Sequence, residues 1–362
     1  MIFEPMHARS TAFFGNVQTG CLRVQPIMHI AQTISELDGD PHQVFAAVGV
    51  SADLFAHPDN VISFEMFGKL FKQSVEATGC LHFGLQLGAS AAANPLGLLG
   101  EVVSQCVDVG TAIAYLQQNF HLHDRGALAT RTIEGPMASI GYAVFDGSIP
   151  AVDQISDAAI AIGVEIMRAL CGPKWRPSSI KLPHRRPDNV RPYQKFFGCI
   201  PEFDAECAAI YFPTLDFKRK IAGADPEKFA VLKEDLKTIA SLNDLSFVDQ
   251  VQRVVYGLVA LRRCSLDEVA AQFSTSRRRV NRLLEREGTT YHRIMQDALR
   301  IHAERLIVNT DMNFGKIAAA LNYADATVFS RAFRGWHGCS PRTWRAENSQ
   351  PTVILARSAK KL

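Results

Sequence analysis

The sequence predicts an α+β N-terminal domain followed by an all-α domain that contains two helix-turn-helix units joined by a long helix. Three observations lead to this prediction. Helical patterns surround a few apolar strands in the first two thirds of the 362 residues. From Phe247 to about Ala346 every pattern is helical. Within that last part, one helix-turn-helix pattern occurs twice, about fifty residues apart.

The same patterns set the expected boundaries of the parts. We expect a flexible N-terminal arm over residues 1–22, the α+β domain over 23–220, a charged linker over 221–245, the all-α domain over 246–345 and a disordered tail over 346–362.

The elements of the α+β domain follow from periodicity and breakers. SFEMFGKLFKQSVEATG (63–79) has one apolar helical face and a stop at Gly79. We expect further helices over 96–110, over 111–123 behind a Thr111 cap, and over 151–171. Alternating apolar residues predict strands, and turn-rich segments separate them: 127–134, 137–146, 178–184 and 208–213.

Composition excludes several classes of protein. No stretch approaches the roughly 18 consecutive apolar residues of a membrane span. The N-terminus carries Glu4 and no apolar run long enough for a signal peptide, so we expect a cytoplasmic protein with no membrane partner. The eight cysteines are scattered, without a CxxC pair or a nearby histidine pattern. They predict neither a disulfide framework nor a metal site.

Charge divides the chain into an acidic and a basic part. Residues 260–345 carry 15 Lys and Arg against 8 Asp and Glu, a balance of +7. Residues 1–259 carry 21 against 27, a balance of −6. This division indicates an anion-binding module attached to a part that does another job.

Residues 266–288, LDEVAAQFSTSRRRVNRLLEREG, predict the first helix-turn-helix unit. The break lies at 273–275, and Ser276 is the N-cap of the second helix. The two helices turn their apolar residues inward: Leu266, Val269 and Ala270, then Val280, Leu283 and Leu284. The outer face of the second helix then presents Arg278, Asn281, Arg282 and Glu285.

Three consecutive arginines, 277–279, begin this second helix, and cations are poorly placed at the positive end of a helix dipole. A nucleic-acid phosphate backbone facing the helix would compensate for them. For an isolated run of arginines, a solvated basic face would be the preferred interpretation. The repeated helix-turn-helix favours the nucleic acid.

Residues 314–338 repeat the design. Asp325 is the cap after a break at 322–324, and Thr327, Arg331 and Arg334 stay accessible. The inward residues are Ile317, Ala318, Leu321, Phe329 and Phe333, with Val328 ambiguous. Residues 289–310 form one helix between the units, roughly 27 Å long at about 1.5 Å per residue. Successive major-groove faces lie about 34 Å apart, so this rod suits two recognition helices in adjacent turns.

Three stretches over about 264–345 resemble the DNA-binding domain of AraC/XylS-type transcriptional regulators: CSLDEVAAQFSTSRRRVNRLLEREG, ALRIHAERLI and FGKIAAALNYADATVFSRAFRGWHGCSPRTWR. The closing SRAFRGWHGCSPRTWR is the most specific part. The resemblance implies an effector-responsive transcription regulator that reads two adjacent major-groove segments of double-stranded promoter DNA. It also implies RNA polymerase as a partner if the protein activates.

The family's groove-facing positions fall on Arg278, Asn281 and Arg282 in the first unit, and on Ala326, Thr327 and Arg331 in the second. With flanking residues added, the predicted DNA-binding set is Ser276, Arg277, Arg278, Arg279, Asn281, Arg282, Ala326, Thr327, Arg331 and Arg334. Asn322 replaces the family's usual glycine in the second turn. We expect the turn to survive, because Asn tolerates the left-handed conformation.

Residues 26–220 resemble the arabinose-binding-like N-terminal domain of a long-chain subgroup that includes regulators of ornithine utilisation. This resemblance implies a small-molecule effector and a homodimer. Candidate pocket residues are His121, His123, Arg125, Tyr142 and His184. The run 183–187, Pro-His-Arg-Arg-Pro, is either an anion site or a solvated loop.

Enzyme motifs are missing from the sequence: it has no Gly-rich phosphate loop, GxSxG or HExxH. GLQLGAS has glycines at a spacing that indicates helix packing. We therefore expect no enzyme activity and no cofactor. Two alternatives stay open: an N-terminal domain that only oligomerises, and a small-molecule-binding protein that the basic module tethers to DNA.

Overall fold

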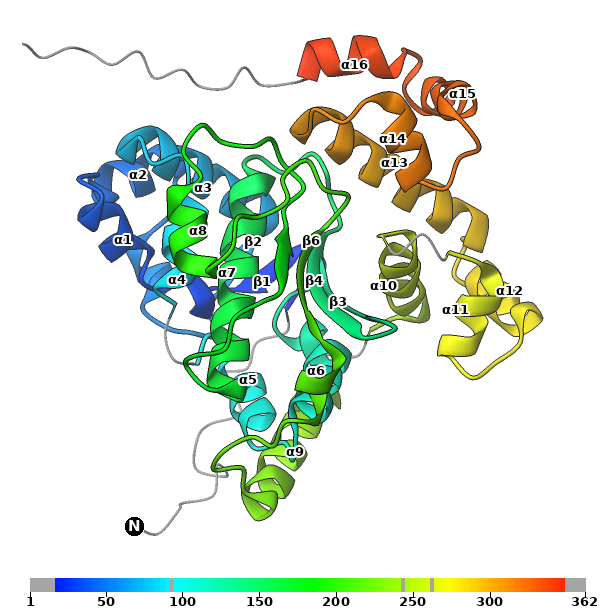
Figure 1. Ribbon diagram of the computed structural model, residues 1–362. Coiled ribbons are helices and arrows are strands. Elements are labelled where there is room, and N and C mark those ends of the chain that lie inside the picture. Colours follow the sequence, from blue (N-terminus) through cyan, green and yellow to red (C-terminus); the bar gives the residue numbers. More distant parts are fainter. Residues whose placement is uncertain (1–16, 92–93, 242–244, 261–263, 349–362) are drawn as a thin grey trace, which may run out of the picture.

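The computed structural model describes residues 17–91, 94–241, 245–260 and 264–348 (Figure 1). The N-terminal part of the chain folds as an α+β domain, and a helical domain follows it, as the sequence predicts. Predicted positions before residue 17 and after residue 348 lie outside the described residues. Within the described residues, no helix combines the length and the apolar character needed to cross a bilayer.

A four-stranded antiparallel sheet forms the centre of the first domain, in the order β3-β4-β6-β5. The strands are β3 (Ala127–Glu134), β4 (Met137–Val144), β5 (Ser179–Lys181) and β6 (Ala208–Pro213). β3 and β4 pair from Ala127 opposite Val144 to Glu134 opposite Met137. Gly135, with φ of 59°, makes the tight turn between them. The two predicted strands are confirmed, although the second ends at Val144 and not at residue 146.

Helix α7 (Val152–Cys171) packs against this sheet and against α4 (Phe83–Ala89). Two glycines make the helix contact close, because a Cβ on Gly84 would overlap the main-chain oxygen of Gln154. A Cβ on Gly88 would similarly overlap the main-chain oxygen of Ala158. The glycines of GLQLGAS therefore serve helix packing, as predicted.

A second apolar core lies beside the sheet, under α1 (Ile30–Glu36), α2 (Pro41–Val48) and α3 (Phe64–Thr78). Gly79 ends α3 with φ of 66°, as predicted, and Ser63 caps its start. The expected flexible arm is too long, however. Residues Cys21–Arg23 form β1 and pair with β2 (Val61–Ser63), and Val17 is fully buried. Apolar residues of the expected arm are thus part of the core. The local periodicity of this segment does not reveal their burial.

The expected helix over 96–110 is wrong at its end. It divides into α5 (Gly97–Ser104) and the start of α6 (Val109–Asn119). Asp108, rather than Thr111, is the N-cap, because its carboxylate accepts the N–H of Thr111 at 2.9 Å. An acidic cap at the break satisfies the first amides of α6.

One segment expected to be irregular is helical, and a helix also occupies the charged segment 214–240, which the sequence predicts as a linker and helix. Helix α8 (Arg191–Phe197) lies in the segment that we read as turns, and Gly198 ends it with φ of 79°. Helix α9 (Pro226–Ser241) occupies most of the expected linker. Its Leu232 and Leu236 are buried in the core of the first domain. Helix α9 is therefore part of that domain, whereas we expected this segment to link the two domains.

The second domain consists of helices with two separate cores. Its helices are α10 (Phe247–Ala260), α11 (Leu266–Gln272), α12 (Arg277–Arg286), α13 (Tyr291–Asn309), α14 (Phe314–Ala320), α15 (Ala326–His337) and α16 (Pro341–Asn348). One core joins α10, α11 and α12 to the first half of α13, and the other joins the second half of α13 to α14, α15 and α16. Helix α10 lies between the sheet and α11 (Figure 1).

Candidate nucleic-acid interface and ligand cavities

The first helix-turn-helix unit is α11 and α12. The Ser276 hydroxyl accepts the N–H of Arg279 at 3.3 Å, which confirms the predicted cap. Val280 and Leu284 of α12 are fully buried. The prediction that Leu283 points inward is wrong in part: it is half-buried and lies outside the apolar core of this unit. These two buried residues, one per helical turn, seat this short helix on α10, α11 and α13.

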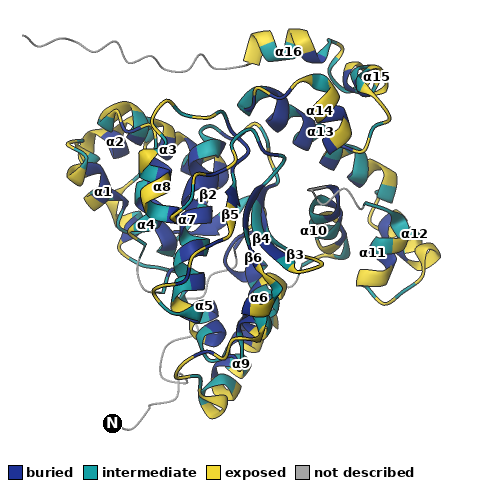
Figure 2. Ribbon diagram, in the orientation of Figure 1, coloured by how far each residue is buried: buried dark blue, intermediate teal, exposed yellow. Residues whose placement is uncertain are grey.

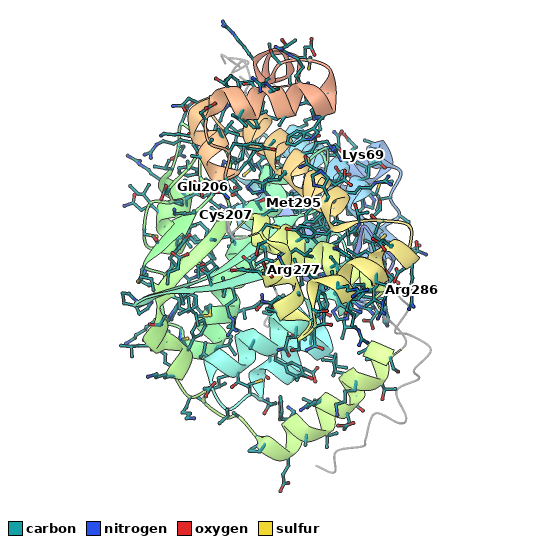
Figure 3. The ribbon with its side chains drawn as sticks, turned by 90° about the vertical axis from the view of Figure 1, so that its right-hand side faces the viewer. Lys69, Glu206, Cys207, Arg277, Arg286 and Met295 are labelled. Atoms are coloured by element: carbon teal, nitrogen blue, oxygen red, sulfur yellow. The ribbon has the colours of Figure 1, made fainter. Side chains whose placement is uncertain are left out.

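The outer surface of α12 is exposed and basic, and Figure 3 shows it between Arg277 and Arg286. Arg278, Arg279 and Arg282 are exposed as well. Arg277 forms an ion pair with Asp267 of α11 at 3.2 Å. Among the described residues, no ion pair holds the next two arginines. The arginine-rich start of α12 thus keeps free cations for an external anion.

Asn281 is the one predicted groove residue of α12 that is half-buried rather than exposed. Ser276 at the cap is exposed. The predicted residues of the first unit therefore share one helix and one surface, with Asn281 at its inner edge.

The second unit is α14 and α15. Asp325 accepts the N–H groups of Thr327 at 2.7 Å and Val328 at 2.9 Å, so it is the predicted cap. These backbone hydrogen bonds, that of Val328 first, lower the pKa of Asp325. Phe329 and Phe333 are fully buried, as predicted. Val328, ambiguous from periodicity, is 42% exposed and joins the outer face.

The remaining predicted residues of α15 lie on its outer side: Thr327, Arg331 and Arg334 are exposed, and Ala326 is half-buried. Figure 2 shows exposed surface on α12 and α15 at the side of the molecule away from the α+β domain.

Both turns contain a residue in the left-handed conformation that is not glycine. Asn322 has φ of 61° and Ser274 has φ of 48°. Ser274 lies two residues before its cap and Asn322 three residues before its cap. The expected survival of the second turn with asparagine is confirmed in the structure.

Helix α13 connects the two units without a break. Thr290 caps it by accepting the N–H of Arg293. Its 19 residues give a length of about 28 Å at about 1.5 Å per residue. Ile294 and Ala298 are buried in the first core, while Ala303 and Leu306 are buried in the second. One stiff helix therefore fixes both units relative to each other.

The closing motif SRAFRGWHGCSPRTWR locks the second unit. Arg345 of α16 donates from Nε to the oxygen of Ile307 at 3.0 Å and from Nη2 to the oxygen of Met312 at 2.8 Å. The rings of Trp344 and His337 lie 4.1 Å apart at their centroids. These contacts tie α16 to the end of α13 and to α15.

Comparison with known proteins agrees with this architecture. Residues 39–221 match the arabinose-binding domain of AraC transcription regulators, N-terminal part, and residues 269–347 match a helix-turn-helix domain. The first match alone covers half of the chain. The protein belongs to the AraC family of transcription regulators. It is therefore a DNA-binding transcription regulator with an arabinose-binding-like N-terminal domain.

Two proteins that are named as regulators are similar to this chain over most of its length. It is 24% identical over 330 residues to the HTH-type transcriptional regulator VirS of Mycobacterium tuberculosis, which covers 90% of this chain and 96% of VirS. It is 23% identical over 325 residues to the ornithine utilization regulator of Pseudomonas aeruginosa, with 86% and 92% covered. The crystal structure of CdpR from Pseudomonas aeruginosa matches 84% of this chain at 18% identity, with a TM-score of 0.41.

The two domains of the regulator contact each other, and two of the contacts among the described residues involve arginines. Arg253 of α10 donates to the main-chain oxygens of Asp124 at 3.2 Å and Ala127 at 2.9 Å. Its guanidinium lies over the ring of Phe145. In the second of these contacts, Arg185 pairs with Asp311 at 2.7 Å. The run 183–187 thus lies at the edge of its domain, where Arg185 contacts the DNA-binding domain and Arg186 is exposed.

Of the candidate pocket residues, Arg125 and His184 have structural partners. Arg125 lies 3.7 Å from Asp249 of α10 and so belongs to the domain contact. The Nε2 of His184 lies 2.9 Å from Asp157, whose other oxygen accepts the hydroxyl of Tyr193. Burial lowers the pKa of His184, but the charge and hydrogen bond of Asp157 outweigh burial and raise it to about 9. This buried network ties α7 to α8.

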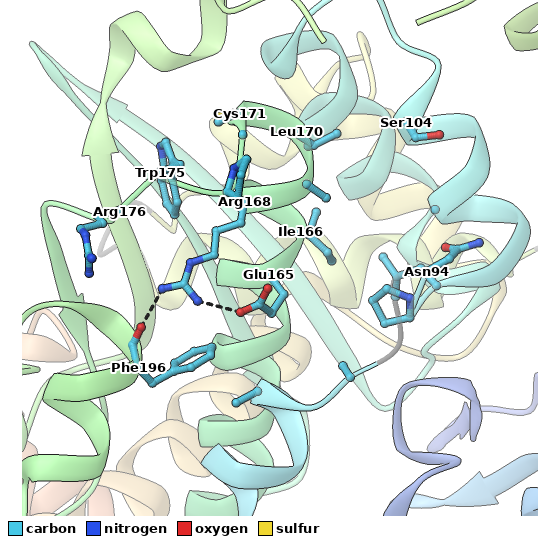
Figure 4. A pocket seen from close by; sticks show the side chains of 18 of the residues that line it. Asn94, Ser104, Glu165, Ile166, Arg168, Leu170, Cys171, Trp175, Arg176 and Phe196 are labelled. Carbon is cyan, nitrogen blue, oxygen red and sulfur yellow. Dashed lines mark hydrogen bonds and ion pairs between the residues drawn. The ribbon is translucent and has the colours of Figure 1, made fainter. Parts of the chain in front are cut away.

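A wide groove of about 1500 Å³ runs between α7, α8 and the segment 94–104 (Figure 4). Arg168 faces it, but its guanidinium is held by Glu165 and by the oxygen of Phe196, both at 2.6 Å. The other charged residues of its walls are exposed: Glu101, Arg176, Arg191, Lys195 and Lys220. The groove is thus an open surface with its one sheltered cation already paired.

A smaller cavity of about 110 Å³ lies inside the α+β domain. His123 and Tyr142, two of the candidates, line it, whereas His121 does not. Asp124 also lines it and accepts the hydroxyl of Tyr142 at 2.8 Å. We had not selected Asp124, although it lies between two selected residues in the sequence. The Tyr142 contact depends on β4 and could not be read from the local pattern.

Proposed function

We propose that this AraC-family regulator binds two adjacent major-groove segments of one promoter site through α12 and α15. The observation that carries the proposal is the pairing of two like units on one continuous helix. Each unit has a capped recognition helix with an exposed arginine six residues after the cap, Arg282 after Ser276 and Arg331 after Asp325. Helix α13 is about 28 Å long. With the width of the two units added, this length is close to the roughly 34 Å between successive groove faces.

The contacts sort into two kinds. Arg278, Asn281 and Arg282 in the first unit, with Thr327 and Arg331 in the second, have side chains that bond base edges. Ala326 provides only a methyl for a thymine methyl group. The exposed Ser276, Arg277, Arg279 and Arg334 provide phosphate contacts, which give affinity and register without sequence information.

Binding sites selected from random DNA test this function. The purified full chain should bind the selected sequence at least about 10³-fold more tightly than a shuffled fragment of equal length at physiological salt. Equal affinity for the two fragments would show a basic tether rather than a sequence reader.

We propose further that the α+β domain makes the regulator responsive to a small molecule. The domain match, the internal cavity and the direct contacts between Arg253 and the segment 124–127 support this. The test is the affinity for the selected DNA with and without a compound that raises the melting temperature of the full chain. An affinity that no stabilising compound changes would leave oligomerisation as the role of this domain.

The active assembly in this proposal is a homodimer, with RNA polymerase as the further partner if the output is activation. The mass of the full chain in solution, measured by light scattering with and without the selected DNA, tests the assembly. A monomer under both conditions would contradict it.

A further inference from the structure

The outer face of α15 carries an apolar side chain to which the contacts proposed above give no role. Val328 is 42% exposed, although it is held in the first turn of the helix, where Asp325 accepts its N–H at 2.9 Å. Among the described residues of the DNA-binding domain, no other large apolar side chain is exposed. Single exposed apolar residues are ordinary on protein surfaces, so exposure alone gives Val328 no function.

The position of Val328 is more informative than its exposure. At about 100° per residue, it lies about 60° around the helix from the exposed Arg331. It lies about 100° from Phe329 and about 140° from Phe333, and both of these rings are fully buried. The N-terminal residues of a recognition helix are those that contact base edges. Val328 is therefore at the edge of the base-reading face, in the turn from which bases are read.

Small residues follow Val328 along the same side of α15. Ala332, one turn later, has only a methyl group, and Gly335, two turns later, has no side chain. A Cβ added to Gly335 would meet no neighbouring element within 4 Å, so packing within the described chain does not require a glycine there. Val328 thus projects beyond these neighbours, and an external group can approach its two γ-methyl groups.

The chemistry of valine limits what this external group can be. In the first unit the equivalent place holds Arg279, since each residue follows its cap by three positions. An arginine is long enough to reach a phosphate from the edge of the face. Valine is short and has no donor or acceptor, so it needs an apolar partner. In the major groove this partner is the C5-methyl group of thymine, which lies on the side of the base nearest its own backbone.

We propose that Val328 is a specificity-determining residue of the second unit and that it packs against the C5-methyl group of a thymine in the DNA segment bound by α15. The proposal rests on the groove binding proposed above and adds one base preference to it. Ala326 is half-buried and lies about 160° from Val328 around the helix, so the two residues do not share one methyl group.

Uracil is the probe for this contact, because it differs from thymine only by the absence of the C5-methyl group. The segment bound by α15 is the one whose footprint weakens in Arg331→Ala. In the selected site, each thymine of this segment is replaced by uracil, one position at a time, and anisotropy titrations measure the affinity of the full chain. At one position the replacement should weaken binding about fourfold, as expected for one methyl group removed from an apolar contact.

Two variants assign the methyl group to its partner. Val328→Ala removes the two γ-methyl groups and should bind the thymine and uracil sites equally at that position. Val231→Ala makes the same change at an exposed valine of α9 and is the matched control, so it should keep the fourfold difference. Both variants are first melted without DNA, and Tm should stay close to that of the natural chain, since neither valine is buried.

The residue next in question is Ala326. Ala326→Gly should keep the fourfold difference at the same thymine, because Ala326 contacts another part of the groove. A difference that disappears in Ala326→Gly and remains in Val328→Ala would assign the methyl group to Ala326 and overturn the proposal.

The other outcomes separate this base preference from groove binding itself. Equal affinity of the natural chain for thymine and uracil at every position, or a selected segment without thymine, overturns the role of Val328 and leaves groove binding through Arg331 in place. Equal affinity for selected and shuffled DNA, which is measured first, would overturn groove binding and the base preference together.

Discussion

Arg282 and Arg331 occupy equivalent places in the two units: each follows the N-cap of its recognition helix by six residues, and each is exposed. The two helices belong to separate apolar cores that share only α13. This equivalence gives the two arginines the same expected task on two segments of DNA.

Replacing either arginine by alanine should weaken binding to the selected DNA by about 1–3 kcal/mol, because a bidentate contact to guanine would be lost. Fluorescence anisotropy titrations measure this change. Lys69→Ala removes one exposed charge on α3 and is the control, with no expected effect. An Arg282→Ala chain that keeps full affinity would remove this residue from the base-reading set.

Arg279 should behave differently, because it flanks the base-reading residues on the exposed start of α12. In Arg279→Gln, binding should weaken by a similar factor on selected and shuffled DNA. The slope of log affinity against log salt should decrease by about 1, as expected for one lost phosphate contact. A loss confined to the selected sequence would instead make Arg279 a base reader.

The turn of the second unit depends on the left-handed conformation of Asn322. Because an alanine is strained at φ of 61°, Asn322→Ala should lower the free energy of unfolding by about 1 kcal/mol. Asn322→Gly should not lower it, since glycine accepts this conformation freely. Urea unfolding of both variants measures the difference, and equal stabilities would argue against strain at this position.

The network of His184 and Asp157 predicts a pH dependence of stability. The folded pKa of His184, about 9, lies above its ordinary value of 6.5. The protonated form thus stabilises the fold, fully below about pH 6.5, and this contribution is lost as the pH rises through 9. The loss amounts to at most about 3 kcal/mol.

Urea unfolding across this range should show the decline in the natural chain. In His184→Gln, which keeps a hydrogen bond to Asp157 without a titrating group, the decline should be smaller. A decline of the same size in this variant would assign it to other groups.

The sequence was sufficient wherever a local pattern determines structure. Both caps, Ser276 and Asp325, and the strands β3 and β4 follow from residue types at fixed spacing. Charge and repetition were sufficient to place the exposed arginines on recognition helices.

What the sequence did not reveal depends on contacts between distant segments. We interpreted the segment of helix α9 as a linker because it is rich in charges of both signs and has few leucines, although those leucines are buried in the core. Arg253 lies on a helix that no motif marks, and its partners are main-chain oxygens about 126 to 129 positions earlier. The cavity forms only when α6, α7 and the sheet are packed together. The sequence therefore indicated two of its lining residues, His123 and Tyr142, together with candidates that do not line it.

Hydroxyl-radical footprinting on a selected binding site tests the central claim most directly, that α12 and α15 occupy consecutive grooves on one side of the duplex. The natural chain should protect two patches one helical turn apart. Arg282→Ala should weaken one patch and Arg331→Ala the other. Protection confined to a single turn, or loss of the same patch in both variants, would contradict the account.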